Sequence, residues 1–296
     1  MSDFSATDAA FAGIRFVREH PRTVAIWAGI QIVISLVVGV STAVTVGPYL
    51  AQLQALNHPG QAADPAQVLA LMGHLAPAYA LFLVLLVLFQ AMLHATMARA
   101  VLEPGDEGFA YIRFGMDEAR QLLLILLITL VMIGADVVAT VVVLVPSIVA
   151  GAAAGGGMSH LAVFICILIV LCAALYCMVR LSLASPLTFA SRKVDLFGSW
   201  TLTRGRFWKM LGTYGLVLGL ALVIGLLTLI IAVCVAAVLG GLGAAASLFQ
   251  PTVASMGAFF VPARLAVSLI WAVATPLFWA LAYMPVSEIY RQIALR

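Results

Sequence analysis

Long apolar runs dominate the pattern of hydrophobic and polar positions along this chain. A helix that crosses a bilayer needs about 20 mostly apolar residues, and six runs reach that length. They cover 24–50, 77–101, 121–150, 160–185, 209–240 and 263–286. The pattern predicts an all-α integral membrane protein with six transmembrane helices in three hairpins. The first outer connection, 51–76, has room for a short helix after Asp64-Pro65.

One amphipathic phrase occurs twice, each time in front of a hairpin. It reads "FAGIRFVREHPR" from Phe11 and "FAYIRFGMDEAR" from Phe109. In both copies apolar residues recur at helical spacing while charged residues occupy another face. The apolar positions are Phe11, Ile14, Val17, Phe109, Ile112 and Met116. The charged positions are Arg15, Arg18, Arg22, Arg113, Asp117 and Arg120. This pattern predicts short cytoplasmic helices lying in the headgroup plane, with Arg15, Arg22, Arg113 and Arg120 as interfacial arginines.

A weaker third copy, "FGSWTLTRGRFWKML" from Phe197, precedes the last hairpin. The chain is therefore expected to be a single membrane domain over 1–296, built from repeats at about 5–101, 105–185 and 194–286. A fixed internal period indicates repeated supersecondary units, and three such hairpins would fit a pseudo-threefold axis. The alternative is that every hairpin begins with aromatic and Arg residues only because these anchor at the interface.

Charge placement predicts the orientation of the spans. Of 15 Lys and Arg residues, all except Arg264 fall on one side when both termini are placed on that side. Such an excess marks the cytoplasmic side, so both termini are expected to be cytoplasmic and no cleaved signal peptide is expected. The net charge of +3 is interpreted as this topology signal rather than as a nucleic-acid footprint.

Few residues in the spans could carry chemistry. The four cysteines, Cys166, Cys172, Cys177 and Cys234, lack metal-ligand spacing and are expected to be free packing residues. No HExxH motif, no paired carboxylates at a usable spacing and no phosphate-binding glycine loop occurs. We therefore expect no catalytic residues, no metal and no cofactor.

Three polar residues lie inside apolar runs. Asp136 stands sixteen residues after Arg120, beyond the bilayer midplane, and Gln90 and His94 lie near the cytoplasmic end of the second run. A carboxylate in a span is a functional candidate. Asp136 would act as a proton relay or substrate contact, pair with a neighbouring helix, or face water. His94 is interpreted as a packing polar group.

The third cytoplasmic segment combines basic and aromatic residues. Lipid-headgroup contacts are predicted for Arg192, Lys193, Trp200, Arg204, Arg206, Trp208 and Lys209. Clustered cations attract anionic lipid, and Trp rings anchor at the headgroup level. The alternative is a plain interfacial anchor without a specific ligand.

The same segment resembles a known family. Arg180, Leu181, Leu183 and Pro186, followed by Ser199, Trp200 and "TRGRFW" from Thr203, resemble the membrane domain of bacterial glycerophosphoryl diester phosphodiesterases and related stand-alone proteins. This sequence carries "ASRKVD" where that family often has an acidic or Gly-rich turn. It shows no phosphodiesterase barrel, so the catalytic residues are not transferred. The resemblance implies a bacterial inner-membrane module close to lipid metabolism.

The leading functional hypothesis is a non-enzymatic module that binds anionic phospholipids or organises a protein partner, including a second copy of itself. The first alternative is a transporter or lipid scramblase that uses Asp136, since internal repeats are common in transporters. The second alternative is a membrane-embedded lipid enzyme, which would require Asp136 and His94 to meet.

Overall fold

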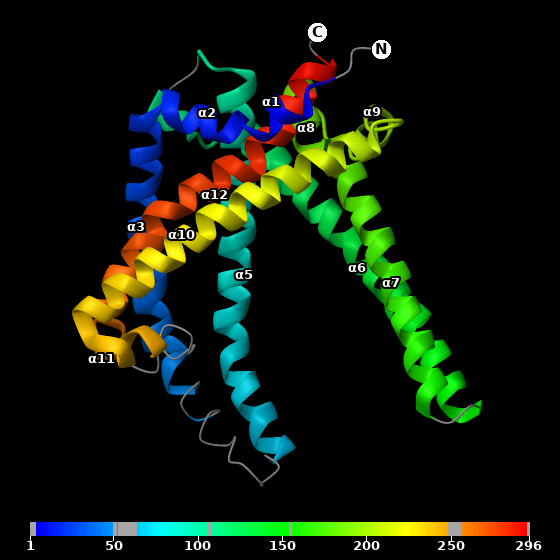
Figure 1. The fold of residues 1–296 in the computed structure, drawn as a ribbon, viewed down its shortest axis with the longest axis horizontal. Helices are drawn as coiled ribbons and strands as arrows, with labels where there is room; N and C mark the ends of the chain where they lie inside the picture. The colour runs from blue at the N-terminus through cyan, green and yellow to red at the C-terminus, as the bar shows by residue number, and fades with distance from the viewer. Residues whose placement is uncertain are drawn as a thin grey trace. The chain divides into compact units, whose positions relative to one another are not determined.

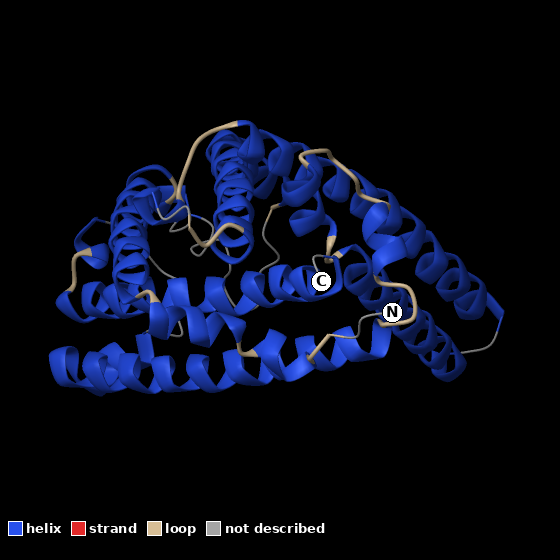
Figure 2. Ribbon diagram, turned by 90° about the horizontal axis from the view of Figure 1, so that it is seen from above, coloured by secondary structure: helices blue, strands red, loops and turns tan. Residues whose placement is uncertain are grey.

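The protein is built from helices joined by short turns. A computed structural model describes residues 4–49, 52, 64–105, 108–153, 156–247 and 256–294, and there is no strand among them (Figures 1 and 2). The short helices of this part are α1 (Ala6–Ala10), α2 (Ala12–Glu19), η1 (Gly108–Tyr111), α8 (Ala184–Ser191), α9 (Gly198–Leu202) and α11 (Met256–Phe259).

Six long helices are apolar enough to cross a membrane. They are α3 (Pro21–Thr45), α5 (Pro65–Leu102), α6 (Met116–Ala153), α7 (Gly156–Leu181), α10 (Phe207–Ser247) and α12 (Pro262–Ala294). At most 28% of the most apolar stretch of any of them is buried within the protein, so most of this apolar surface needs another cover. Lipid provides that cover. The prediction of six spanning helices in a multi-pass, all-α membrane protein is confirmed.

Proline marks where three of these helices begin. Pro21, Pro65 and Pro262 each occupy the first helical position, where a missing N–H costs no hydrogen bond. Asp64 stabilises one start, because its Oδ1 accepts from the Ala66 N–H at 3.0 Å. The helix predicted after Asp64-Pro65 does begin at Pro65, but it is not short, because α5 continues unbroken to Leu102.

The contacts of the chain divide it into two compact units. Unit 1 comprises Met1–Ala10, Gln90–Leu216 and Tyr283–Arg296. Unit 2 comprises Phe11–Phe89 and Val217–Ala282. Helices α5, α10 and α12 each contribute one part to each unit. The two units are described separately below.

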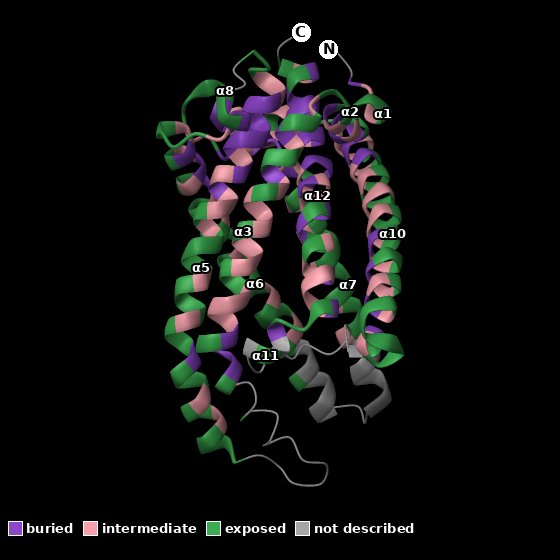
Figure 3. Ribbon diagram, turned by 90° about the vertical axis from the view of Figure 1, so that its left-hand side faces the viewer, coloured by how far each residue is buried: buried purple, intermediate pink, exposed green. Residues whose placement is uncertain are grey.

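The core of unit 1 lies where the ends of several helices meet. One apolar cluster there consists of Phe4, Ala9, Val179, Leu183, Met210, Ile289 and Tyr290. A second cluster joins Leu124 of α6 to Ala184 of α8 and to Leu196. The buried residues gather around α8, whereas the spanning stretches are mostly exposed or intermediate (Figure 3). Helices α6 and α7 pack along each other as consecutive spans (Figure 1).

The helices of unit 2 approach one another closely at glycine and alanine residues. A Cβ added to Gly13 of α2 would lie 2.6 Å from the carbonyl carbon of Ala280, so α2 rests directly on the backbone of α12. A Cβ added to Gly39 of α3 would collide with the side-chain ring of Phe259 in α11. Farther along, alanines of α10 pack against Ala263 and Val267 of α12.

The first copy of the repeated phrase forms a helix. In α2 the side that packs inward carries Ala12, Gly13 and Phe16, whereas Phe11 is 45% exposed. Phe16 stacks on His20 and on Trp27, at centroid distances of 4.4 and 5.6 Å. The buried side of α2 is therefore not the predicted apolar face, because Phe11 is exposed and Ile14 and Val17 are only half-buried. The position of α2 in the headgroup plane stays a prediction.

The second copy does not form the predicted amphipathic helix. Phe109, Ala110 and Tyr111 adopt left-handed backbone angles, with φ of 39°, 58° and 64°, and the next helix begins only at Met116. Each such residue costs about 1–2 kcal/mol and persists only where its surroundings hold it. Here the Arg99 side chain holds the Tyr111 carbonyl, and the Tyr111 hydroxyl donates to the Pro104 carbonyl at 3.1 Å.

The third copy is interrupted. Helix α9 ends at Leu202, and Gly205, with φ of 76°, turns the chain into α10, which begins at Phe207. The three related phrases therefore have three backbone conformations. The threefold repeat and the pseudo-threefold axis are not confirmed and stay predictions.

Candidate functional site

Buried polar side chains of unit 1 concentrate where α5 ends, α6 begins and α7 ends. Three clusters of polar side chains, centred on Arg99, His94 and Arg180, involve short segments that connect the spans. A buried polar group without a hydrogen-bond partner lowers the stability of the fold. The hydrogen bonds and ion pairs of each cluster therefore hold the connecting segments in place.

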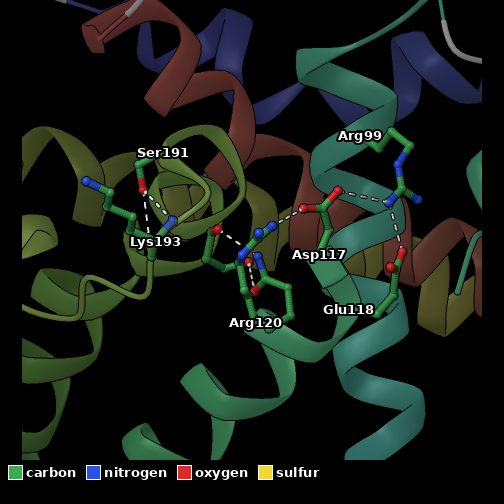
Figure 4. A network of polar contacts seen from close by, with 8 residues as sticks. Arg99, Asp117, Glu118, Arg120, Ser191 and Lys193 are labelled. Atoms are coloured by element: carbon green, nitrogen blue, oxygen red, sulfur yellow. Dashed lines mark hydrogen bonds and ion pairs between the residues drawn. The ribbon is translucent and has the colours of Figure 1, made fainter. Parts of the chain in front are cut away.

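The Arg99 cluster is a charge network. Arg99 is 3% exposed, and its Nη2 donates to Glu118 Oε1 at 2.8 Å while its Nη1 donates to the Tyr111 carbonyl at 2.6 Å (Figure 4). Asp117 lies 3.8 Å from Arg99 Nη2 and pairs with Arg120 at 2.7 Å. Two cations therefore face two carboxylates, and the network closes the connection between α5 and α6.

Local sequence explains why these acids are available. Asp117 and Glu118 lie in the first turn of α6, where the helix dipole favours negative charge. Arg99 lies in the last turn of α5, where a cation is favoured. The ring of Phe189, from α8, lies 5.6 Å from the Arg99 guanidinium carbon. Arg99, Asp117 and Glu118 are therefore each stabilised by the dipole at their own helix end and also by the opposite charge that they face.

The His94 cluster is an uncharged chain of hydrogen bonds. Tyr283 donates to Gln90 Oε1 at 2.7 Å, and its ring meets the His94 ring edge-on at 4.7 Å. His94 Nδ1 lies 3.0 Å from Ser185 Oγ, and Ser185 lies 3.0 Å from Gln121 Oε1. Four segments of unit 1 thus meet through polar side chains: α5, α6, α8 and the end of α12.

The amide of Gln121 fixes the direction of this chain. Its Nε2 donates to the Ser185 carbonyl at 2.9 Å, so Oε1 must be the atom that faces the Ser185 hydroxyl. The Ser185 hydroxyl therefore donates to Oε1, and its proton points to Gln121 rather than to His94.

The Arg180 cluster joins the end of α7 to α9. The guanidinium carbon of Arg180 lies 4.8 Å over the Trp200 ring and 5.6 Å over the Tyr176 ring. Its Nη1 donates to Thr203 Oγ1 at 3.1 Å, and its backbone carbonyl accepts from Ser199 Oγ at 2.7 Å. Trp200, Ser199 and Thr203 thus all converge on one arginine, and they are among the residues on which the family resemblance rests.

Helix α9 is held in place at both of its ends. At its start, Asp195 Oδ1 accepts from the Gly198 N–H at 2.7 Å, and a side chain at Gly198 would collide with Asp195 and Leu187. Within α9 and just beyond it, Thr203 Oγ1 donates to the Ser199 carbonyl at 2.9 Å. This arrangement fixes the basic residues that flank α9 relative to Arg180.

The basic–aromatic segment 192–209 divides into exposed and engaged residues. Phe197 and Trp208 are 73% and 79% exposed, and Arg192, Lys193 and Arg204 are also exposed. The engaged members each have a contact: Trp200 with Arg180, Arg206 with the Leu202 carbonyl at 3.0 Å, and Lys209 with the Phe4 ring at 5.2 Å. Of the seven residues predicted to contact headgroups, four are therefore fully displayed.

The other predicted residues lie apart from these clusters. Arg15 and Arg22 are exposed in unit 2, and Arg113 is exposed on the turn before α6. Arg120 is committed to Asp117. Asp136 is exposed on α6, and His94 contacts Ser185 and Tyr283 rather than Asp136.

Sequence reasoning missed Arg99 and Arg180 as the centres of two clusters. Each was counted only as a cytoplasmic charge, because both stand at the ends of apolar runs where positive residues are common. The usable signal for Arg180 is its place at the head of the motif that carries the family resemblance. For Arg99 it is the acidic pair Asp117-Glu118 at the start of the next span.

Comparisons with known proteins do not bear on function here, so the functional argument rests on the contacts described above. Scans of protein-family models and searches of curated proteins and of solved structures find no match to this chain.

Proposed function

We propose that unit 1 binds anionic phospholipid headgroups through the basic–aromatic segment 192–209, as a non-enzymatic membrane module. One observation carries this proposal. Arg192, Lys193 and Arg204 are exposed, and none of their side chains has an ion-pair partner among the described residues. Cations left without protein partners beside two exposed aromatic rings are suited to lipid phosphates.

The position of the rings supports contact with the membrane surface. Trp208 lies in the first turn of α10, one of the spanning helices, so its exposed ring belongs at the level where that span enters the headgroups. Phe197 immediately precedes α9 and is exposed on the same segment. Each cation near an anionic surface contributes about 1 kcal/mol of attraction.

The charge distribution and the family resemblance support the same proposal. The segment belongs to the side that carries the excess of Lys and Arg, which we take to be the cytoplasmic face of a bacterial inner membrane. The resemblance to phosphodiesterase membrane domains gives the module a setting close to lipid metabolism. A protein partner would be a second use of the same exposed surface.

The transporter alternative has less support. Asp136 is exposed on α6, and its backbone carbonyl accepts a hydrogen bond from the Thr140 hydroxyl at 2.8 Å. A proton relay needs a partner for the carboxylate, and the Asp136 carboxylate makes no hydrogen bond or ion pair with the described residues. The enzyme alternative is weakened because the Ser185 proton points to Gln121 rather than to His94.

Native mass spectrometry with phosphatidylglycerol tests the proposal. The variant Arg192→Gln/Lys193→Gln/Arg204→Gln removes three exposed cations, so at about 1 kcal/mol each we expect a roughly hundredfold loss of affinity. The matched control Arg15→Gln/Arg18→Gln/Arg22→Gln removes the same charge from unit 2. Equal losses in both variants would mean that net charge alone attracts the lipid, and no loss in the first would refute the proposal.

A further inference from the structure

Two arginines of unit 1 are buried, and only one of them has a counter-charge. Arg99 is 3% exposed and Arg180 is 7% exposed. Arg99 faces Glu118 at 2.8 Å and Asp117 at 3.8 Å. Arg180 has no carboxylate partner among the described residues, although a buried cation without a counter-charge is costly by several kcal/mol.

The guanidinium of Arg180 also keeps most of its hydrogen-bonding capacity. An arginine has five N–H donors, and the hydrogen bond that Arg180 makes within the described residues is the one from Nη1 to Thr203 Oγ1. Its Nε is buried without an acceptor. The Trp200 and Tyr176 rings attract the cation, but they supply no acceptor oxygen in these contacts.

Four acids of unit 1 are engaged elsewhere. Asp117 and Glu118 serve Arg99 and Arg120, and Glu288 accepts from Arg291 at 2.9 Å. Asp195, the acid within the basic–aromatic segment, accepts from the Gly198 N–H and stabilises the start of α9. The missing counter-charge of Arg180 is therefore not supplied by these side chains.

We propose that Arg180 is the seat of one bound phosphate group, held by the Nε–Nη2 edge of its guanidinium. With Nη1 directed to Thr203, this edge presents two parallel N–H donors, the arrangement that matches two oxygens of a phosphate. The rings of Trp200 and Tyr176 hold the cation in position, and Arg204, which directly follows Thr203, adds a second positive charge to the same segment.

The shared chemistry of the ligand is a phosphate oxygen pair, from a phospholipid headgroup or from a soluble phosphate. The lipid source rests on the proposed function, whereas the anion seat rests only on the surroundings of Arg180. The two ideas can therefore fail separately. The exposed cations would attract many headgroups weakly, and Arg180 would hold a single one with defined geometry.

Lipid retention and thermal stability of the purified protein test the seat. We expect one phosphatidylglycerol to survive collisional activation on the wild-type protein. It should be lost at least tenfold more readily from Arg180→Lys, which keeps the charge but not the paired donors. The control Arg15→Gln/Arg18→Gln/Arg22→Gln, which removes charge from unit 2 alone, should retain the lipid.

A wild-type measurement keeps the test valid if Arg180 variants do not fold. Delipidated protein in neutral detergent is heated with phosphatidylglycerol, with inorganic phosphate or with phosphatidylcholine. A rise in unfolding temperature with phosphatidylglycerol supports a lipid phosphate, and a rise with inorganic phosphate alone supports the seat but refutes the lipid source. No rise with either, or equal retention by wild type and Arg180→Lys, would overturn the seat.

Discussion

Neighbouring charges give Arg99 and Arg180 different roles, although both are buried at the end of a spanning helix. Arg99 is neutralised by Glu118 and holds the Tyr111 carbonyl, so its guanidinium is used up in closing the loop between α5 and α6. Arg180 is surrounded by rings and hydroxyl groups and keeps unfilled donors. The first arginine is therefore interpreted as structural and the second as a binding residue.

The Arg99–Glu118 pair leads to a prediction about stability. Glu118→Gln leaves Arg99 buried without its nearest charge, which should lower the free energy of unfolding by about 3–5 kcal/mol. Asp117→Asn is the matched control, because Asp117 is 31% exposed and lies farther from Arg99, so its loss should amount to about 1 kcal/mol or less. Thermal unfolding in detergent would measure both, and equal effects would contradict the buried pair.

Sequence reasoning reached the right residue types of the candidate site but not their contacts. It found the basic–aromatic segment, because charge and ring content are visible along the chain. It did not find that Trp200 faces Arg180, or that Lys209 covers Phe4, because these pairs form only when separate helices meet. A pattern along one helix indicates which residues share a face, and it leaves their partners undetermined.

At the level of helices, the apolar runs were a reliable guide and the amphipathic phrases were not. A span must satisfy its backbone within itself, so a long apolar run has almost one possible structure. The phrase from Phe11 forms α2, whereas the phrase from Phe109 forms a left-handed turn. Short segments outside the apolar core take the conformation that their tertiary contacts select.

Helix α2 offers a prediction about close packing in unit 2. Gly13→Leu would drive a side chain into the Ala280 backbone, at an expected cost of about 1–3 kcal/mol, and should displace α2 from α12. We expect faster tryptic cleavage at Arg15 and Arg18 in this variant. Gly29→Leu is the control, because an added Cβ there meets nothing within 4 Å. Unchanged cleavage in Gly13→Leu would show that α2 does not depend on this contact.

At the scale of the whole molecule, the six spans and the charge count give a prediction about orientation. An even number of crossings with both termini on the Lys- and Arg-rich side predicts a cytoplasmic C-terminus. Green fluorescent protein fused after Arg296 should then fluoresce in a bacterial host, and alkaline phosphatase fused there should be inactive. The same reporters placed after residue 60 or 155 should give the opposite result. An active phosphatase at the C-terminus would reverse the proposed side of lipid binding.

The salt bridge between Arg99 and Glu118 also bears on how the chain is synthesised. Its two ends are separated by only the loop between α5 and α6, so the contact becomes possible as soon as Glu118 has left the ribosome, before the apolar part of α6 has emerged. If the salt bridge closed the loop at that moment, it would keep the start of α6 on the side of the membrane where α5 ends. The third span could then enter the bilayer in one direction only, so that a contact first seen as a local lock would also determine the topology of every helix translated after it.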